Sequence, residues 1–157
     1  MKIFQASSEI PSMTSEEVYR MLESKMYLRL ATIDEQDWPN IHSVWFYYDR
    51  IKERLLLTTS KHAKKTQNVR DQPYVYFSID NGDNAPKGVK GRGIVTIIED
   101  STKTISEGNK ISMKYLGRLD HPAAKKITED AKKDNIVLIE ISPKFFSTWD
   151  CSKVQYK

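Results

Sequence analysis

The sequence lacks the residues that cross-link small proteins. Its 157 residues include one cysteine, Cys151, so no disulfide can form within the chain. No CxxC motif or cysteine–histidine cluster is present to hold structural zinc, and His42, His62 and His121 do not have the spacing of metal ligands. We therefore expect a protein of a reducing compartment that has no metal site.

Long apolar runs are also missing. Nowhere do the roughly eighteen consecutive apolar residues of a membrane-spanning helix occur, and the opening MKIFQASSEIPS lacks the apolar stretch of a secretory signal. The location that we expect is the cytoplasm. The net charge of +4, from 25 basic and 21 acidic residues, is too small to indicate a nucleic-acid partner by itself. No GxSxG motif or activated serine or cysteine indicates nucleophilic catalysis.

Short strand patterns make up most of the chain. The length predicts one domain over residues 1–157, since it is sufficient for one buried core. Thr14 and Glu17 have the spacing of a capping box, which predicts a short helix over 14–24. Alternating apolar, aromatic and β-branched residues then predict strands over 26–33, 41–48, 54–60, 74–80, 88–100, 136–142 and 144–150.

The remaining segments predict how these strands are connected. The first three strands should form an antiparallel meander, and residues 61–71 should be helical up to Pro73. The glycines of 88–100 mark a bulge or a close backbone approach. Residues 101–133 predict two helical pieces, divided around Gly117 and His121-Pro122. Six or seven strands with few helices indicate a mainly β (α+β) antiparallel barrel with peripheral helices.

One candidate site is the stretch TTSKHAKKTQNVRDQP, residues 58–73. On a helix, Lys61, Lys64, Lys65 and Asn68 would share a face and gather three ammonium groups and one amide. Two threonine hydroxyls end the preceding strand, and the start of a helix offers free N–H groups to a phosphate. The alternative is an ordinary solvated basic face.

The strand predicted over 41–48 carries a second indication. It has apolar or aromatic residues on both faces, with Val44 and Phe46 on one side and Trp45 and Tyr47 on the other. A flat apolar ligand could cover one face, or the strand could be buried between the barrel core and a subunit interface. Both interpretations are open at this point.

A third interpretation concerns nucleic acid. The aromatic residues of PYVYFSID and the basic residues of GVKGRG could suit single-stranded nucleic acid on an OB-like barrel. Asp71, Asp80 and Asp83 interrupt that surface, however, and their charge would repel the phosphate backbone. The acidic residues therefore argue against a nucleic-acid partner.

Taken in order, three stretches resemble a known family. LATIDEQDWPNIHSVWFYYD, LLLTTSKHAKKTQNVRDQPYVYFSID and GVKGRGIVTIIED are similar to the flavin-binding split barrel family typified by pyridoxamine 5′-phosphate oxidase. The resemblance covers residues 14–150 and is strongest from 28 to 100. It implies an antiparallel split β-barrel that binds FMN at the interface of a homodimer and acts as an oxidoreductase on a small molecule.

The resemblance also implies roles for individual positions. The threonines and serine at 58–60 would line the flavin and its ribityl chain, and the lysines at 64 and 65 would grip the phosphate. The strand 42–46 would lie beside the isoalloxazine, and a lysine within 87–92 of the partner chain would complete the site. The implied cofactor-binding residues are His42, Ser43, Val44, Trp45, Thr58, Thr59, Ser60, Lys64, Lys65, Asn68, Lys90 and Trp149.

Several positions depart from the family pattern. Ala63 stands where the family has a phosphate-binding serine, and His42 and Tyr47 stand where the authentic oxidase has arginine and lysine. Asp37 replaces a turn glycine, which aspartate can do because it tolerates left-handed backbone. The C-terminal motif that holds the oxidase's phosphorylated substrate is absent, so we assign neither a substrate nor a catalytic residue.

Three alternatives share the same barrel. A non-catalytic flavin-binding module would have the same sequence features. A haem-binding relative would need a free histidine near the pocket, and the candidates are His42 and His62. A deazaflavin-dependent reductase would need extra basic residues for the cofactor's anionic tail, for which the candidates are Lys52, Arg54, Lys87, Lys90 and Arg92.

Overall fold

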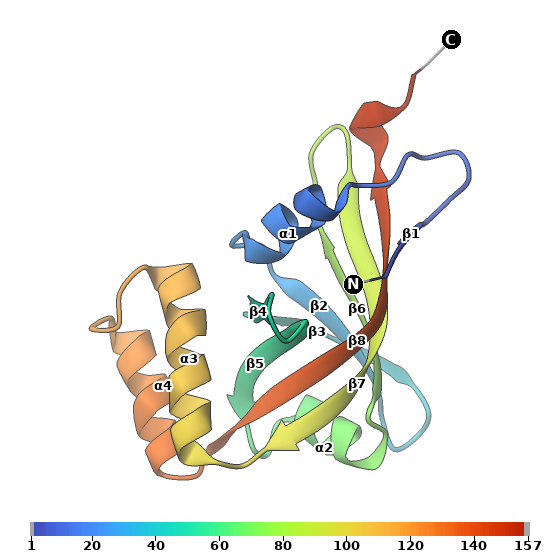
Figure 1. Cartoon of the computed structure of the whole chain (residues 1–157). Coiled ribbons are helices and arrows are strands. Elements are labelled where there is room, and N and C mark those ends of the chain that lie inside the picture. Colours follow the sequence, from blue (N-terminus) through green and yellow to red (C-terminus); the bar gives the residue numbers. More distant parts are fainter. Residues whose placement is uncertain (1, 156–157) are drawn as a thin grey trace.

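The computed structural model describes residues 2–155, in which a strongly curved sheet is surrounded by helices at its rim (Figure 1). This is the predicted α+β split barrel. Most neighbouring strands are antiparallel, and β1 alone among the described strands runs parallel to its neighbour, β8. The strands are β1 (Ile3–Gln5), β2 (Leu28–Ile33), β3 (Pro39–Val44), β4 (Tyr47–Asp49), β5 (Arg54–Ser60), β6 (Tyr74–Asp80), β7 (Lys87–Ile98) and β8 (Ile136–Asp150).

The order of the strands explains how the sheet curls. It runs β3-β2-β6-β7-β8-β5-β4, so β3 and β4 lie at opposite ends of the path. Only Trp45 and Phe46 separate these two strands in the chain. The chain therefore leaves β2 at Val44, which pairs with Leu28, and joins β5 at Tyr47, which pairs with Leu56. The single strand predicted over 41–48, and the meander built on it, were wrong for this reason.

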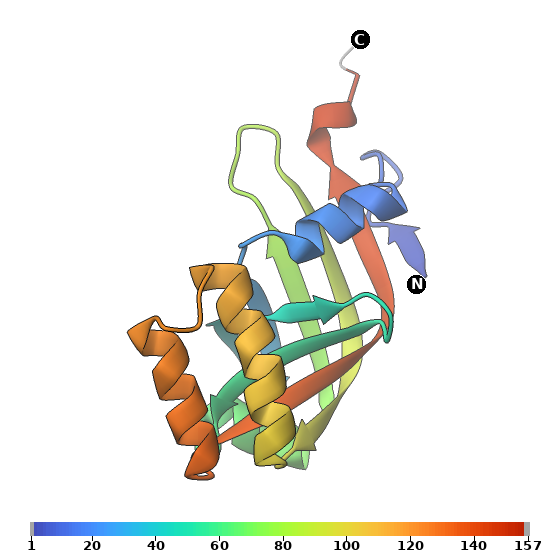
Figure 2. The same cartoon turned by 60° about the vertical axis from the view of Figure 1, so that its left-hand side comes forward.

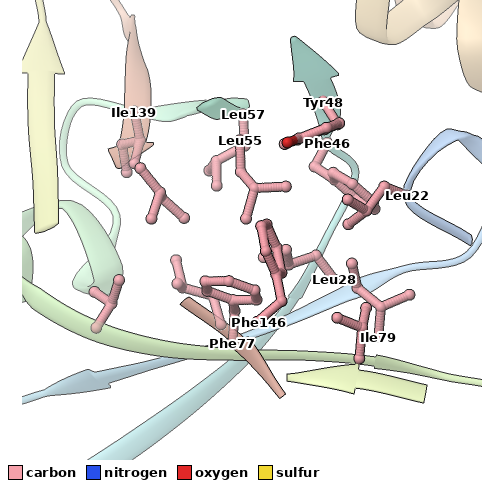
Figure 3. Packing of buried hydrophobic residues seen from close by; sticks show 14 of the residues in the cluster. Leu22, Leu28, Phe46, Tyr48, Leu55, Leu57, Phe77, Ile79, Ile139 and Phe146 are labelled. Carbon is pink, nitrogen blue, oxygen red and sulfur yellow. The ribbon is translucent and has the colours of Figure 1, made fainter. Parts of the chain in front are cut away.

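The inner faces of the strands form one apolar core, seen in Figure 3. Leu28, Leu55 and Ile79 are fully buried there, and Phe77 and Phe146 pack edge to face with their ring centroids 5.7 Å apart. Alternate residues of each strand point inward, as the period-2 pattern predicts. Each such side chain contributes about 1.5–3 kcal/mol through burial.

Strands β7 and β8 form the long central pair of the barrel. The register shifts between Arg92 and Gly93, which confirms the predicted bulge. A Cβ on Gly91 would lie 2.3 Å from the carbonyl oxygen of Phe145, so the predicted close approach is also confirmed. The two strands predicted over 136–150 are instead one strand, because Pro143 faces the bulge at Gly93, where a missing N–H group is tolerated.

Within residues 2–155, four α-helices lie on the rim of the barrel. They are α1 (Ser15–Glu23), α2 (Lys64–Asp71), α3 (Ser101–Leu116) and α4 (Pro122–Lys132). The capping box at Thr14 is formed, and Gly117 ends α3 with a φ of 74°. Figure 2 shows α3 and α4 as an antiparallel pair beside β5. No helix among residues 2–155 is long and apolar enough to cross a membrane.

Candidate functional site

A cavity of about 370 Å³ lies where β3 and β5 end. One side is formed by these strands and the first turn of α2, and the other by the helical hairpin α3–α4. Several positions that are distant in sequence meet here, and they include the predicted residues Ser43, Val44, Trp45, Thr58, Thr59 and Lys65. The structure thus brings half of the predicted set together around one space.

Lys65 is the central cation of this cavity. Its Nζ donates to Thr59 Oγ1 at 3.4 Å, and within residues 2–155 it forms no ion pair with a carboxylate. Burial lowers the pKa of Lys65. The lysine also lies in the first turn of α2, where the helix dipole disfavours a positive charge and favours an anion. Ala63 gives this turn no side-chain cap, so its first N–H groups have no side-chain acceptor.

The other lysines of the stretch point elsewhere. Lys64 forms an ion pair with Glu35, and Lys61 Nζ lies 2.6 Å from Asp134 Oδ2. The predicted face of three ammonium groups is therefore not formed. The physical reason is that α2 begins at Lys64, so Lys61 lies in the preceding turn and does not follow the helical spacing.

Asn68 and His42 belong to a polar network beneath the cavity. Asn68 is buried, and its Nδ2 donates to Thr32 Oγ1 at 2.8 Å. The same hydroxyl lies 3.2 Å from His42 Nε2. The Thr32 hydroxyl also lies 3.5 Å from the Asn40 carbonyl, to which it can donate, so this one group links β2 to β3 and to α2. Burial lowers the pKa of His42, and the nearby charge of Lys65 lowers it further.

Three predicted residues lie away from the cavity. Ser60 is exposed, and its Oγ accepts from the His62 N–H at 3.2 Å. Lys90 and Trp149 belong to the central strands β7 and β8, where Lys90 pairs with Ser147 and Trp149 with Gly88. Neither side chain lines the cavity of this chain.

Five residues that line the cavity were not predicted from the sequence. Ile111, Ile127 and Asp130 come from the helical hairpin, and Tyr27 and Ile136 come from outside it. A signal for this wall was present in Gly108, in the middle of α3. A Cβ there would lie 3.1 Å from Ile127 Cγ2 and 3.5 Å from Thr58 Cγ2. A glycine inside a helix often marks such close packing, although the sequence does not say against which strand.

An aromatic pair closes one side of the cavity. Trp45 stacks on Tyr115 of α3 with ring centroids 4.8 Å apart and an interplanar angle of 3°. The Tyr115 hydroxyl donates to the Met26 carbonyl at 2.7 Å and accepts from the Phe46 N–H at 3.4 Å. Burial raises the pKa of Tyr115 to about 12, so this hydroxyl keeps its proton at neutral pH.

Together these groups match a flat, largely apolar molecule that carries an anion. Lys65 and the hydroxyls of Thr58 and Thr59 can bind the anionic part. Trp45, Ile111 and Ile127 offer apolar contact to the rest. Ser43 lies on β3, an edge strand of the sheet path, whose unpaired side leaves backbone groups free to bond a ligand.

Known proteins share this architecture. A family model described as pyridoxamine 5′-phosphate oxidase matches residues 14–150. A conserved hypothetical protein from Mycobacterium tuberculosis superposes with a TM-score of 0.79 at 23% identity, covering 96% of this chain and 92% of that one. An F420 reductase superposes at 0.68 with 29% identity, covering 85% and 98%.

A third solved structure, the heme storage protein HutZ from Vibrio cholerae, superposes at 0.65 with 17% identity, covering 83% of this chain and 89% of that one. A comparison with curated proteins gave no match. The likenesses at 23% and 17% identity concern the fold, which residues 2–155 share with proteins of differently described activity.

Proposed function

The chain belongs to the pyridoxamine 5′-phosphate oxidase family, and from this premise we propose that it binds FMN in the cavity between β3, β5 and α3–α4 and is a flavin-dependent oxidoreductase. The observation that carries the proposal is Lys65, a partly buried cation at an uncapped helix start that lacks a carboxylate partner among the described residues. A phosphate would supply the missing negative charge. We name no substrate.

The residues present fit this cofactor. Lys65 and Thr59 would hold the phosphate, and the ring would lie along β3 near Ser43 and Trp45. When bound, FMN supplies the hydride acceptor or donor, while the protein supplies binding, orientation and exclusion of water. Ile111 and Ile127 form the apolar wall that would keep water from the ring.

An absorption spectrum of the purified protein, followed by titration of the stripped protein with FMN and riboflavin, tests the proposal. FMN should bind more tightly than riboflavin by roughly 10- to 150-fold, because a charge-assisted hydrogen bond contributes about 1.5–3 kcal/mol. Equal affinities would contradict a phosphate site at Lys65. Absence of binding would contradict the flavin proposal as a whole.

A deazaflavin is the second candidate cofactor, favoured by the 29% identity to the F420 reductase. The basic residues expected to hold its tail are dispersed. Arg54 lies at the opposite end of β5 from Thr59, and its Nε is 3.6 Å from Glu140 Oε1. Lys90 and Arg92 lie on β7. Titration with a deazaflavin beside FMN ranks the two cofactors directly.

Neither of the two histidines considered as haem ligands, His42 and His62, offers a free ring nitrogen to this cavity in the described part of the chain. His42 has its Nε2 engaged by Thr32 at 3.2 Å, and His62 is exposed and does not line the cavity. A haem titration that gave a Soret band would contradict this ranking. A non-catalytic flavin module would bind FMN without reduction by nicotinamide nucleotides, so a reduction assay separates it from an oxidoreductase.

We further propose that the chain forms a homodimer through the outer face of the sheet. Register places Ile41, Ala31, Tyr76, Arg92 and Phe145 in one row across five strands. Ile41 is 68% exposed and Tyr76 51%, which is unusual for large apolar side chains on one face. A hollow of about 860 Å³ lies on this face.

Light scattering measures the molar mass of the protein in solution and so tests the proposed dimer. We expect the mass of two chains for the wild type and of one chain for Tyr76→Glu, because the substitution removes the apolar contact of the ring and places a carboxylate that must be desolvated on association. Lys90 and Trp149 would then face the partner's cavity, so the monomeric variant should also bind FMN more weakly. A wild-type monomer that binds FMN fully would contradict the proposal.

A further inference from the structure

A second cavity, of about 630 Å³, lies between α1, β4 and α3. Its walls include Leu22 at the end of α1, Tyr47 and Tyr48 of β4, and Met113 on α3, which is 47% exposed at the rim. None of the residues that line the first cavity, between β3, β5 and α3–α4, contributes to it. It is a separate, mostly apolar space with its own polar groups.

Lys114 is the main polar group of this second cavity. Its Nζ donates to the Leu22 carbonyl at 2.8 Å and lies 3.5 Å from the ring centroid of Phe46. Among the described residues it has no carboxylate within ion-pair distance. An ammonium group has three protons, and the structure accounts for one of them with a hydrogen-bond acceptor.

Lys110 provides an internal comparison. It lies one turn earlier on α3 and lines the same cavity, but its Nζ is 2.9 Å from Glu107 Oε2. Its charge is therefore already balanced. Burial lowers the pKa of Lys114 to about 7, and the charge of Glu23, which also lines the cavity, acts in the opposite direction. The remaining ionisable groups around this space are Lys25 after α1, Tyr47 and Tyr48 on β4, and Tyr115 on α3.

We propose that this second cavity binds an organic carboxylate with an apolar body, whose carboxylate pairs with Lys114. The inference does not rest on the proposed flavin function, since the two cavities have no lining residue in common. A singly charged head matches Lys114, the cation that is partly buried against the apolar wall, because the cavity is also lined by Lys25 and by the carboxylate of Glu23, which would oppose a more highly charged anion. The apolar walls at Leu22, Tyr48 and Met113 match an alkyl or aryl body.

Binding of such a ligand is linked to a proton. The carboxylate requires the ammonium form of Lys114, so above the pKa of the free amine the ligand must bind together with one proton. The affinity should therefore fall tenfold for each pH unit above about 7 and be nearly constant below it. A ligand held by the apolar walls alone would show no such dependence.

Isothermal titration with octanoate, and with octanamide as the neutral probe of the same shape, tests the proposal. We expect octanoate to bind at least tenfold more tightly than octanamide at pH 6.5, and to lose about a hundredfold in affinity by pH 9. Proton uptake at pH 8 should appear as a dependence of the heat on the buffer's ionisation enthalpy.

Matched variants identify the site. Lys114→Met should abolish the preference for octanoate, whereas Lys103→Met should change the affinity by less than about threefold, because Lys103 lies on the same helix outside the cavity and already pairs with Glu140. Lys114→Arg keeps a positive charge at every pH and should bind octanoate without pH dependence. This variant keeps the test valid if Lys114→Met does not fold. Equal binding of both probes to the wild type, or an unchanged pH dependence in Lys114→Arg, would overturn the proposal.

Discussion

The two cavities each hold a partly buried lysine without a carboxylate partner, but the two lysines lie at opposite ends of helices. Lys65 is in the first turn of α2, where the helix dipole opposes a cation. Lys114 is in the last turn of α3 and donates to a carbonyl of the last turn of α1, where the dipoles of both helices favour a cation. Lys114 is thus partly stabilised without a ligand, whereas Lys65 depends more on an external anion.

This difference is the reason for proposing a phosphate site in the smaller cavity rather than in the larger one. Around Lys65, free N–H groups and threonine hydroxyls add donors to the ammonium group. Around Lys114, the neighbouring groups are aromatic rings, a carbonyl and the carboxylate of Glu23, which would oppose a doubly charged phosphate more than a single charge with an apolar body. The residues around each lysine, more than its burial, therefore define the ligand.

The largest effect that tests this comparison should come from the two neighbouring lysines of α2. Lys65→Ala should weaken FMN binding by roughly 10- to 150-fold, because one charge-assisted hydrogen bond is lost. Lys64→Ala should weaken it by less than about threefold, since Lys64 already pairs with Glu35 at the surface. Fluorescence titration of FMN measures both. Equal losses in the two variants would mean that both lysines grip the phosphate.

The stability of Lys114→Met as a function of pH should give the next largest effect. The folded pKa of Lys114 is about 7, below its ordinary value, so the unfolded chain binds more protons between about pH 7 and pH 10. Over this window the wild type should gain about 2 kcal/mol relative to the variant, after allowance for partial exposure. Urea unfolding at pH 6.5, 8 and 9.5 checks the sign. A constant difference would contradict the lowered pKa.

A smaller effect should follow from the network beneath Lys65. Thr32→Val leaves Asn68 Nδ2 and His42 Nε2 without the hydroxyl, which should cost roughly 1.5 kcal/mol of stability. Thr96→Val is the matched control, because Thr96 is also on a strand but is exposed. Urea unfolding of the two variants measures the difference. Equal stabilities would show that the network does not support the α2 region.

The smallest effect should come from Tyr115, next to Lys114 in the chain and stacked on Trp45 of the first cavity. Tyr115→Phe loses the hydrogen bond to the Met26 carbonyl and should cost about 1 kcal/mol, with FMN affinity unchanged. Tyr27→Phe, at a ring that is 55% exposed, should cost less than about 0.5 kcal/mol. A large loss of FMN affinity in Tyr115→Phe would show that the two cavities are coupled.

Much of the fold follows from local patterns, because those patterns are set by neighbouring residues. The bounds predicted for β5 and β6 are those observed, and Gly117 and His121-Pro122 divide α3 from α4 as expected. Asp37 takes the left-handed backbone that its turn requires, with a φ of 63°. The break at Trp45 could not be predicted, because it depends on which strand each half of the segment pairs with.

The residues that line the candidate site could be predicted where a single strand or turn positions them, but not where elements distant in sequence meet. Residues 43–45 and 58–59 converge with Lys65 as the resemblance implies. The partners of Lys64 and Lys61 could not be predicted, since Glu35 and Asp134 come from other parts of the chain. The wall from α3–α4 was missed because helical periodicity identifies an apolar face but not the surface that covers it.

The position of α3–α4 in the chain has an engineering consequence. The hairpin is inserted between two strands that are already paired at their ends, with Ile98 opposite Leu138, so a short turn could connect them without changing any strand register. The strand register of the barrel therefore does not depend on the length of the hairpin, whose further contacts include the hydrogen bonds of Lys114 and Tyr115 to the carbonyls of Leu22 and Met26. Exchange of this hairpin would replace Ile111, Ile127 and Asp130 in the lining of the first cavity while keeping Lys65, Thr58 and Thr59, which come from the barrel and α2.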